Sequence, residues 1–408
     1  QQTFDCIYND DSLGLTEPTT KWVGRYNERQ NYYFTDNPHS VANVDSGLTY
    51  SWTIPLRPYE TAVRRVAFGA KGPSYYVSSA HGNDGNVGAY DTPLKTLGAA
   101  ITKIGNNVGY IYIQDYNELT STITVPSGAN ITFMSSDYSR EGTPIDDIIT
   151  IRRNSGLVSG PMFSTNGGTM RFSNLVLDGN RTGAAGNTSP ILSADRGTVG
   201  IMSGATLQNN QVNAAGMGSA IQISGSADLE MNYGTITGNT AVDRGAVNFD
   251  STGKFMIQNR ISIEGNTLSS GEKANVYLSE GKYMTVVGDL DTSAIGVTTA
   301  RLPEASAGGA STQAAQEVNV AVPLGRSAVD ISPSPFVDNF FADRAGSEGT
   351  GLYVTSGTAG LSEAGENHDR NTVLKKNGYQ ITFFIKDADT GGSITGAPAI
   401  QAKTYGSG

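Results

Sequence analysis

The stretch that decides the fold reads Gly234-Thr-Ile-Thr-Gly-Asn239, and related segments recur at residues 175–180, 205–210 and 261–266. Each segment is a short apolar strand that ends in Gly-Asn or Asn-Asn. The final asparagines lie 30, 29 and 27 residues apart, and they are Asn180, Asn210, Asn239 and Asn266. Because a repeat of about 20–50 residues is typical of a solenoid, residues 167–280 predict a parallel β-helix with one coil per repeat.

Each coil accommodates three short strands. The middle strand alternates apolar and polar residues, which places every second side chain inside the coil. The predicted inward residues are Leu175, Leu177, Ala205, Leu207, Ile236, Ile261 and Ile263. Since neighbouring coils stack about 4.8 Å apart, these side chains should form aliphatic ladders along the axis.

The asparagine that ends each middle strand has two interpretations. In the structural one it is a left-handed turn residue in a stacked ladder, because asparagine tolerates positive φ and hydrogen bonds along the stack. In the functional one it contacts a ligand or a metal. Recurrence in register favours the structural interpretation, and the Gly-Gly-x-Gly-x-Asp repeat that binds Ca²⁺ is missing.

Composition agrees with an all-β fold of short strands and tight turns. The 408 residues include 50 glycines, and only 16% are charged, which does not suit a helical bundle. The net charge of −10 argues against nucleic acid or an anionic membrane as partner, since both bind clustered Lys and Arg. No run of 18 apolar residues occurs, so we expect no membrane insertion.

Composition also divides the chain into four regions. Residues 1–70 predict a β-rich N-terminal segment and residues 71–300 the β-helix. Residues 301–374 predict terminal coils with a cap and a linker, and residues 375–408 a β-hairpin.

A helix over residues 93–105 is expected to cover the first coil, because an open end of a solenoid exposes its core. Thr92 or Asp91 is the expected N-cap, and Pro93 suits the first turn. The apolar face of this helix comprises Leu94, Leu97, Ile101 and Ile104.

Two stretches resemble known families. Residues 77–101 combine a Val-Ser strand, a Gly-Asn-Asp loop and Pro-Leu-Lys-Thr-Leu before the helix. This pattern resembles the N-terminal segment of right-handed parallel β-helix proteins of the pectate-lyase-like superfamily, which implies that fold. Residues 234–247 resemble repeats in large surface proteins of Gram-positive bacteria, which implies an adhesin-like, cell-wall or secreted role.

Residues 379–398 resemble the first hairpin of B-type pilin-like stalk modules. That resemblance implies a lysine able to form an isopeptide bond, and Lys386 is the matching position. Such modules need about three times the residues that follow, so two alternatives stay open. The hairpin either opens a further module or pairs with strands of residues 1–70. Pairing between subunits would build a filament by strand addition.

Cys6 is the single cysteine, so an internal disulfide and a cysteine-based zinc site are excluded. We expect it to behave as a small buried hydrophobe. The alternative is a reactive thiol or a thioester with Gln380, for which no neighbouring base is seen that would lower the thiol pKa.

Charged side chains do not predict a catalytic set. The outward positions of the first strands and the turns hold Arg171, Gly200, Glu230, Met256, Asp178, Gln208, Thr237 and Glu264. We expect no carboxylates on adjacent coils and no basic residue beside them, although polysaccharide chemistry requires such clusters. His39, His81 and His368 lie far apart in sequence. No catalytic residue, cofactor or metal site is therefore predicted.

Three functions remain. The first is a non-enzymatic extracellular module, adhesin-like and rigid, that binds a glycan or a host surface protein. The second is a structural subunit of a surface filament or pilus, assembled by self-association through residues 1–70 and 375–408. The third is a polysaccharide lyase or glycosidase, because the β-helix also occurs in such enzymes and fold alone does not decide function.

Overall fold

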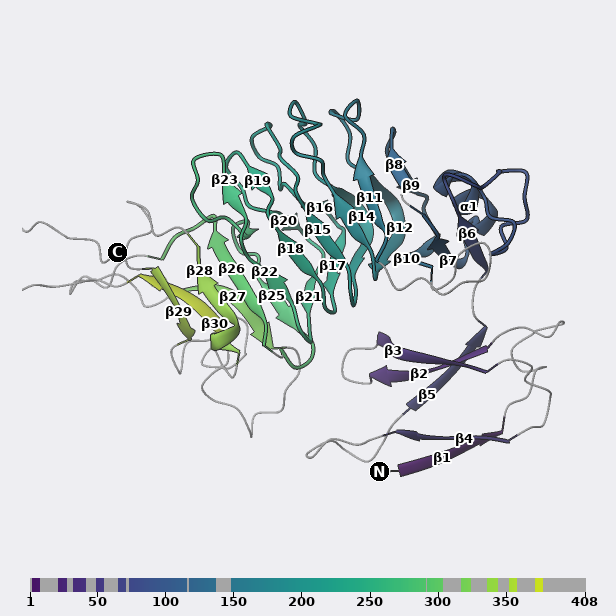
Figure 1. The fold of residues 1–408 in the computed structure, drawn as a ribbon. Helices are drawn as coiled ribbons and strands as arrows, with labels where there is room; N and C mark the ends of the chain where they lie inside the picture. The colour runs from purple at the N-terminus through teal and green to yellow at the C-terminus, as the bar shows by residue number, and fades with distance from the viewer. Residues whose placement is uncertain are drawn as a thin grey trace, which may run out of the picture.

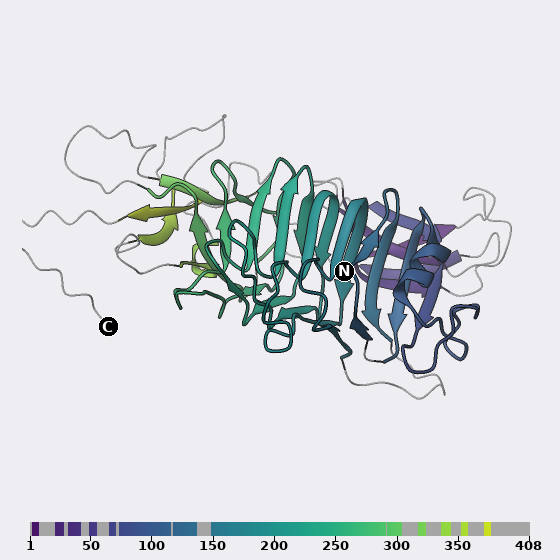
Figure 2. The ribbon, with the colours of Figure 1, turned by 90° about the horizontal axis from the view of Figure 1, so that it is seen from above.

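A stack of parallel strands forms the largest part of the chain, seen from the side in Figure 1 and from above in Figure 2. The computed structural model describes residues 2–7, 21–27, 32–41, 49–54, 65–70, 73–115, 117–136, 148–290, 292–303, 317–323, 336–343, 352–357 and 371–376. As the repeat predicts, the protein is all-β and its central part is a parallel β-helix.

Three rows of parallel strands run along the stack, one from each side of a coil. The first row contains β6 (Ser74–Val77), β7 (Val108–Ile113), β10 (Asn130–Ser135), β12 (Phe163–Ser173), β14 (Leu192–Ile201), β17 (Asp228–Met231), β21 (Phe255–Ile257), β25 (Met284–Val286) and β27 (Glu317–Pro323). The second row contains β8 (Asn117–Leu119), β11 (Thr150–Arg153), β13 (Val176–Asp178), β15 (Thr206–Gln208), β18 (Thr235–Thr237), β22 (Ser262–Ile263), β26 (Ala294–Thr299) and β28 (Phe340–Ala342). The third row contains β9 (Ile123–Val125), β16 (Ile221–Gly225), β20 (Val247–Ser251) and β24 (Val276–Leu278), together with the first halves of β12 and β14 and the last residues of β26.

The inside of the coils is apolar. All seven inward residues predicted for the middle strands are at most 1% exposed, so the alternation prediction is confirmed. Leu177, Leu207 and Ile236 occupy one register position in successive coils and form an aliphatic ladder. Phe133, Phe163 and Phe172 pack together with ring centroids 4.9 to 5.3 Å apart, in stacked and edge-on pairs that suit aromatic rings.

A helix covers the N-terminal end of the stack, as predicted, but it starts later than expected. Helix α1 spans Leu97–Ile104, and its N-cap is Thr96, whose hydroxyl accepts from the N–H of Ala99 at 3.1 Å. Leu94 instead forms a parallel bridge with Val77, so the helix begins only after it. Asp91, Thr92 and Pro93 therefore lie before the helix. The predicted apolar face is buried.

The N-terminal region contains antiparallel strands outside the solenoid. Strand β1 (Gln2–Ile7) pairs with β4 (Thr49–Ile54). Strand β2 (Lys21–Asn27) lies between β3 (Tyr32–Val41) and β5 (Arg65–Ala70). A β-rich segment before the solenoid was predicted for residues 1–70.

The C-terminal end of the stack changes from parallel to antiparallel pairing. Strand β30 (Thr372–Lys376) pairs with β27 on one side and with β29 (Leu352–Ser356) on the other. The 3-10 turn η3 (Val337–Asn339) precedes β28, and Phe336 and Phe340 are buried in the core there. Residues 336–342 therefore pack on the last coils.

Candidate functional site

Three of the four repeated asparagines form a ladder inside the stack. The backbone N–H of Asn210 donates to Oδ1 of Asn239 at 3.0 Å, and that of Asn239 donates to Oδ1 of Asn266 at 3.0 Å. Nδ2 of Asn239 also donates to Oδ1 of Asn266 at 3.0 Å. All three residues are fully buried, so their amides stabilise the coils and are not presented to a ligand.

The ladder continues in both directions beyond the residues that the repeat singled out. At one end, Nδ2 of Asn187 donates to Oδ1 of Asn210 at 3.1 Å. At the other, Asn266 donates from N and Nδ2 to Oδ1 of Asn275, at 3.2 and 2.9 Å. Asn275 then donates from N and Nδ2 to the carboxylate of Asp343, at 2.7 and 2.6 Å. The ladder therefore joins the middle coils to the segment that covers the C-terminal end.

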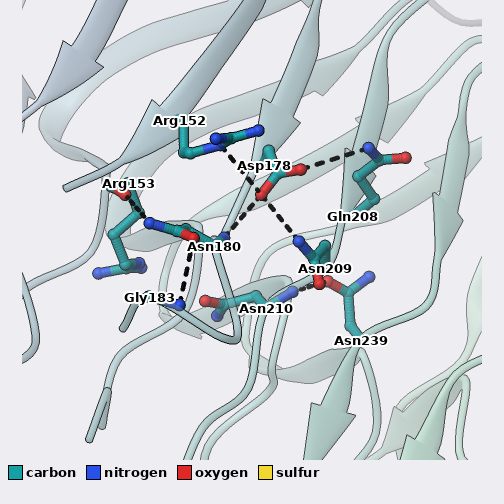
Figure 3. Close-up of polar contacts among 9 residues, drawn as sticks. All are labelled: Arg152, Arg153, Asp178, Asn180, Gly183, Gln208, Asn209, Asn210 and Asn239. Atoms are coloured by element: carbon teal, nitrogen blue, oxygen red, sulfur yellow. Dashed lines mark hydrogen bonds and ion pairs between the residues drawn. The ribbon is translucent and has the colours of Figure 1, made fainter. Parts of the chain in front are cut away.

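Asn180 lies outside this ladder, which differs from the sequence-based expectation (Figure 3). Its φ is 51°, its Oδ1 accepts from the N–H of Gly183 and its Nδ2 donates to the carbonyl of Arg153. The left-handed residue of each following coil stands one position before the ladder asparagine. These residues are Asn209, Gly238 and Gly265, with φ of 55°, 64° and 71°. We expected one asparagine per coil to have the positive φ and to make the ladder hydrogen bonds. In the structure, one residue has the positive φ and the residue after it makes the ladder hydrogen bonds.

The reason for the shift is one extra residue in the first of these turns. Asp178 and Gln208 are in register, but Gly179 and Asn180 together face the single residue Asn209. A side chain at Gly179 would collide with Asn210, since its Cβ would lie 2.3 Å from that of Asn210. The glycine leaves room for the first full rung of the ladder.

Asp178 holds this turn together (Figure 3). Its Oδ1 accepts from the N–H of Asn180 at 2.7 Å and from Nδ2 of Asn209 at 3.0 Å, while Nε2 of Gln208 lies 3.5 Å from Oδ2. Nε of Arg152 lies 4.0 Å from the carboxylate. Asp178 is only 6% exposed. A buried carboxylate with several donors is suited to fixing a turn.

Arg153 is a second buried structural residue. Nη1 donates to the carbonyl oxygens of Leu157 and Gly160 at 2.8 and 2.6 Å, and Nη2 to those of Ser189 and Pro190 at 3.2 and 2.6 Å. Burial lowers the pKa of Arg153 to about 10. The guanidinium thereby ties the loop after β11 to the residues that precede β14.

The outer face of the first row carries a polar cluster that sequence reasoning missed. Arg171 donates from Nε and Nη2 to Oε2 of Glu230 at 3.2 and 3.0 Å, and from Nη1 to Oδ1 of Asn130 at 2.8 Å. Arg171, Gly200 and Glu230 occupy one register position in three successive coils. We call Asn130, Arg171, Gly200 and Glu230 the Arg171 row.

The Arg171 row corrects the expectation that no basic residue lies beside the outer carboxylates, and so does the approach of Arg152 to Asp178. Gly200 makes the contact between Arg171 and Glu230 possible, because the stem of Arg171 crosses the coil that contains this glycine. A Cβ at Gly200 would lie 2.6 Å from Cγ of Arg171. A gap in the side-chain pattern therefore allows a contact between residues two coils apart.

The Arg171 row is accessible and held in place. The side chains of Arg171 and Glu230 are 26% and 21% exposed. Within the described part of the chain, the contacts of Arg171 use three of the five N–H groups of a guanidinium. The remaining donors, with the free lone pairs of Glu230, can bind hydroxyl groups. The row contains one carboxylate, whereas glycoside hydrolysis usually requires two.

A backbone outlier follows the strand that carries Glu230. Tyr233 follows the end of β17 and has φ of 135°, a region that side chains other than glycine rarely adopt. It is 37% exposed. Strained residues of this kind concentrate at functional sites, and no signal in the sequence predicted the conformation.

The remaining candidate residues are the three proposed for a covalent crosslink. Cys6 lies in β1 opposite Tyr50, and Lys386 and Gln380 fall outside the described residues, so the crosslink predictions stay predictions. Among the residues that the structure describes, no three His, Cys, Asp or Glu side chains form a group able to hold a metal. In the same part of the chain, no helix is long and apolar enough to cross a membrane.

Comparison with known proteins matches the chain to no family model, no curated protein and no solved structure. The structure alone therefore assigns the chain to the parallel β-helix fold class. Because that fold serves several functions, the function has to be argued from the Arg171 row.

Proposed function

We propose that this protein is a non-enzymatic, extracellular, adhesin-like module that binds a glycan on the Arg171 row. The observation that carries the proposal is the half-buried pair of Arg171 and Glu230, fixed by Asn130 on the outer face of a rigid stack. A planar guanidinium and a carboxylate recognise pairs of hydroxyl groups through paired hydrogen bonds, and such groups fix the orientation of a ligand.

The dimensions of the row suit an extended ligand. Asn130 and Glu230 lie three coil steps apart, which corresponds to about 14 Å at the usual strand spacing. A short oligosaccharide lying along the stack would contact each polar group in turn. Because β-strands hold the side chains, little ordering is required on binding.

The finer identity of the fold belongs to the same proposal. A right-handed helix of the pectate-lyase-like superfamily is supported by the resemblance of residues 77–101. A secreted or cell-wall location in Gram-positive bacteria is supported by the resemblance of residues 234–247 to surface-protein repeats.

The test is binding of the full chain to a glycan array, followed by titration calorimetry with the best ligand. Arg171→Ala should weaken that affinity about tenfold or more, because hydrogen bonds to a charged group are lost. Arg196→Ala is the matched control, since Arg196 is 63% exposed and donates to Asn166 at 2.7 Å. Absence of glycan binding, or an equal loss in the control, would refute the proposal.

A filament subunit is the alternative that one observation favours. Strand β29 pairs antiparallel with β30 at the C-terminal end of the stack, and a strand at the end of a sheet can accept a strand from another copy. Negative-stain images of the chain at high concentration would show fibres if this function holds. Release of unsaturated uronides from pectin would instead indicate a lyase.

A further inference from the structure

Tyr233 adopts a backbone conformation that its own side chain opposes. In the turns after β12, β14 and β21, asparagine or glycine adopts a positive φ. Examples are Asn174 (45°), Gly204 (73°) and Asn259 (60°), whereas Tyr233 reaches 135°. Asparagine and glycine enter this region at little cost, and a bulky aromatic residue does not.

The surrounding structure holds Tyr233 in this state. Just before it, the N–H of Asn232 donates to the carbonyl of Ile201 at 2.9 Å. Just after it, the N–H of Thr235 donates to the carbonyl of Ala205 at 2.9 Å. A backbone fixed on both sides cannot relax, so a glycine at position 233 would make the coil more stable. The presence of a tyrosine there therefore has to be explained by its ring.

Tyr233 lies in the turn that directly follows the strand of Glu230. Tyr233 comes three residues after Glu230, at the end of the strand that carries this carboxylate. It remains 37% exposed although its neighbours Met231 and Asn232 are buried. A tyrosine offers a rigid apolar face with a polar tip, which suits the mixed surface of a sugar ring.

We propose that Tyr233 is the stacking platform of the glycan site and that the ligand is a neutral oligosaccharide; this inference rests on the proposed function. The ligand class follows from charge. Arg171 and Glu230 neutralise each other, and the whole chain carries a net charge of −10, which repels uronate and sialate polymers. A neutral sugar forms hydrogen bonds with the pair and stacks its ring on Tyr233.

Three variants of the full chain test this inference against a panel of cellotetraose, mannotetraose, chitotetraose and, as the acidic member, tetragalacturonate. Tyr233→Gly should raise the melting temperature by ~2–4 °C, because strain is relieved. It should also weaken binding of the neutral ligand about tenfold, because the stacking surface is lost. Tyr233→Phe keeps the ring and should bind within about threefold of the parent. Tyr283→Ala removes another exposed tyrosine, 43% exposed, and should change neither property.

The outcomes separate the two proposals. If Arg171→Ala weakens binding and Tyr233→Gly does not, the stacking role is refuted while the glycan function stands. Preference for tetragalacturonate would refute the neutral ligand class. If the parent chain binds none of the four sugars or any other glycan on the array, both proposals fail together.

Discussion

Replacing Asn239 by alanine would measure the energy of the buried ladder. Oδ1 of Asn239 accepts from the N–H of Asn210, and Nδ2 donates to the carbonyls of Leu207 and Thr237 and to Oδ1 of Asn266, at 2.9 to 3.1 Å. A buried N–H left without an acceptor costs about 1–3 kcal/mol, and each further lost bond about 0.5–1.5 kcal/mol. We expect Asn239→Ala to lower the free energy of unfolding by about 3–5 kcal/mol.

The assay is urea unfolding followed by far-ultraviolet circular dichroism, because both tryptophans, Trp22 and Trp52, precede the solenoid. Asn180→Gly is the control. Asn180 makes two side-chain bonds and glycine tolerates its positive φ, so we expect a change within about 1 kcal/mol. The double variant with Asn266→Ala should cost less than the sum of the single ones, because they share a bond. A loss below about 1 kcal/mol for Asn239→Ala, or one equal to the control, would refute the reasoning.

Three further predictions concern other contacts. Gly200→Val should push the stem of Arg171 away from Glu230 and weaken glycan binding about tenfold in calorimetry; unchanged affinity would contradict the role of the glycine. Arg153→Met should cost about 3–5 kcal/mol in urea unfolding at pH 7, because four buried carbonyls lose their donor. The folded pKa of Arg153 is lowered to about 10, so above that pH the unfolded chain binds more protons than the folded chain. The free energy of unfolding of the parent, relative to that of this variant, should therefore rise between pH 9 and pH 11. A difference between the two that does not change with pH would contradict this. Thr96→Ala should cost about 1 kcal/mol by removing the N-cap of α1, and an equal loss from Thr92→Ala would contradict the cap assignment.

The fold could be predicted from the sequence because its signal is periodic. A repeat of 27 to 30 residues with alternating apolar positions requires stacked coils, and the inward residues from Leu175 to Ile263 are buried. The turns were harder to predict, because one inserted residue is enough to shift a rung. Gly179 and Asn180 face one residue of the next coil, and nothing in the local sequence distinguishes this turn from the others.

The candidate site could not be predicted because its contacts cross coils. Arg171 and Glu230 lie 59 residues apart in sequence and meet only because Gly200, between them, has no side chain. The start of α1 was predicted too early for a similar reason, because a residue distant in sequence fixes it. Asp84 accepts from the N–H groups of Lys95 and Thr96 at 2.9 and 2.8 Å, which places the cap later than the proline suggested.

The chain of amides from Asn187 to Asp343 has a polarity. Each asparagine in it donates to the next member toward the C-terminal end, and Asn210, Asn239, Asn266 and Asn275 each accept from the member before. A carboxylate has acceptors only, so an aspartate can terminate such a chain but cannot continue it. Additional coils, each carrying one asparagine, can therefore be inserted upstream without breaking the pattern. To extend the ladder beyond Asp343, its side chain would first have to be replaced by one with an N–H donor. The ladder can therefore gain rungs before the aspartate but not after it.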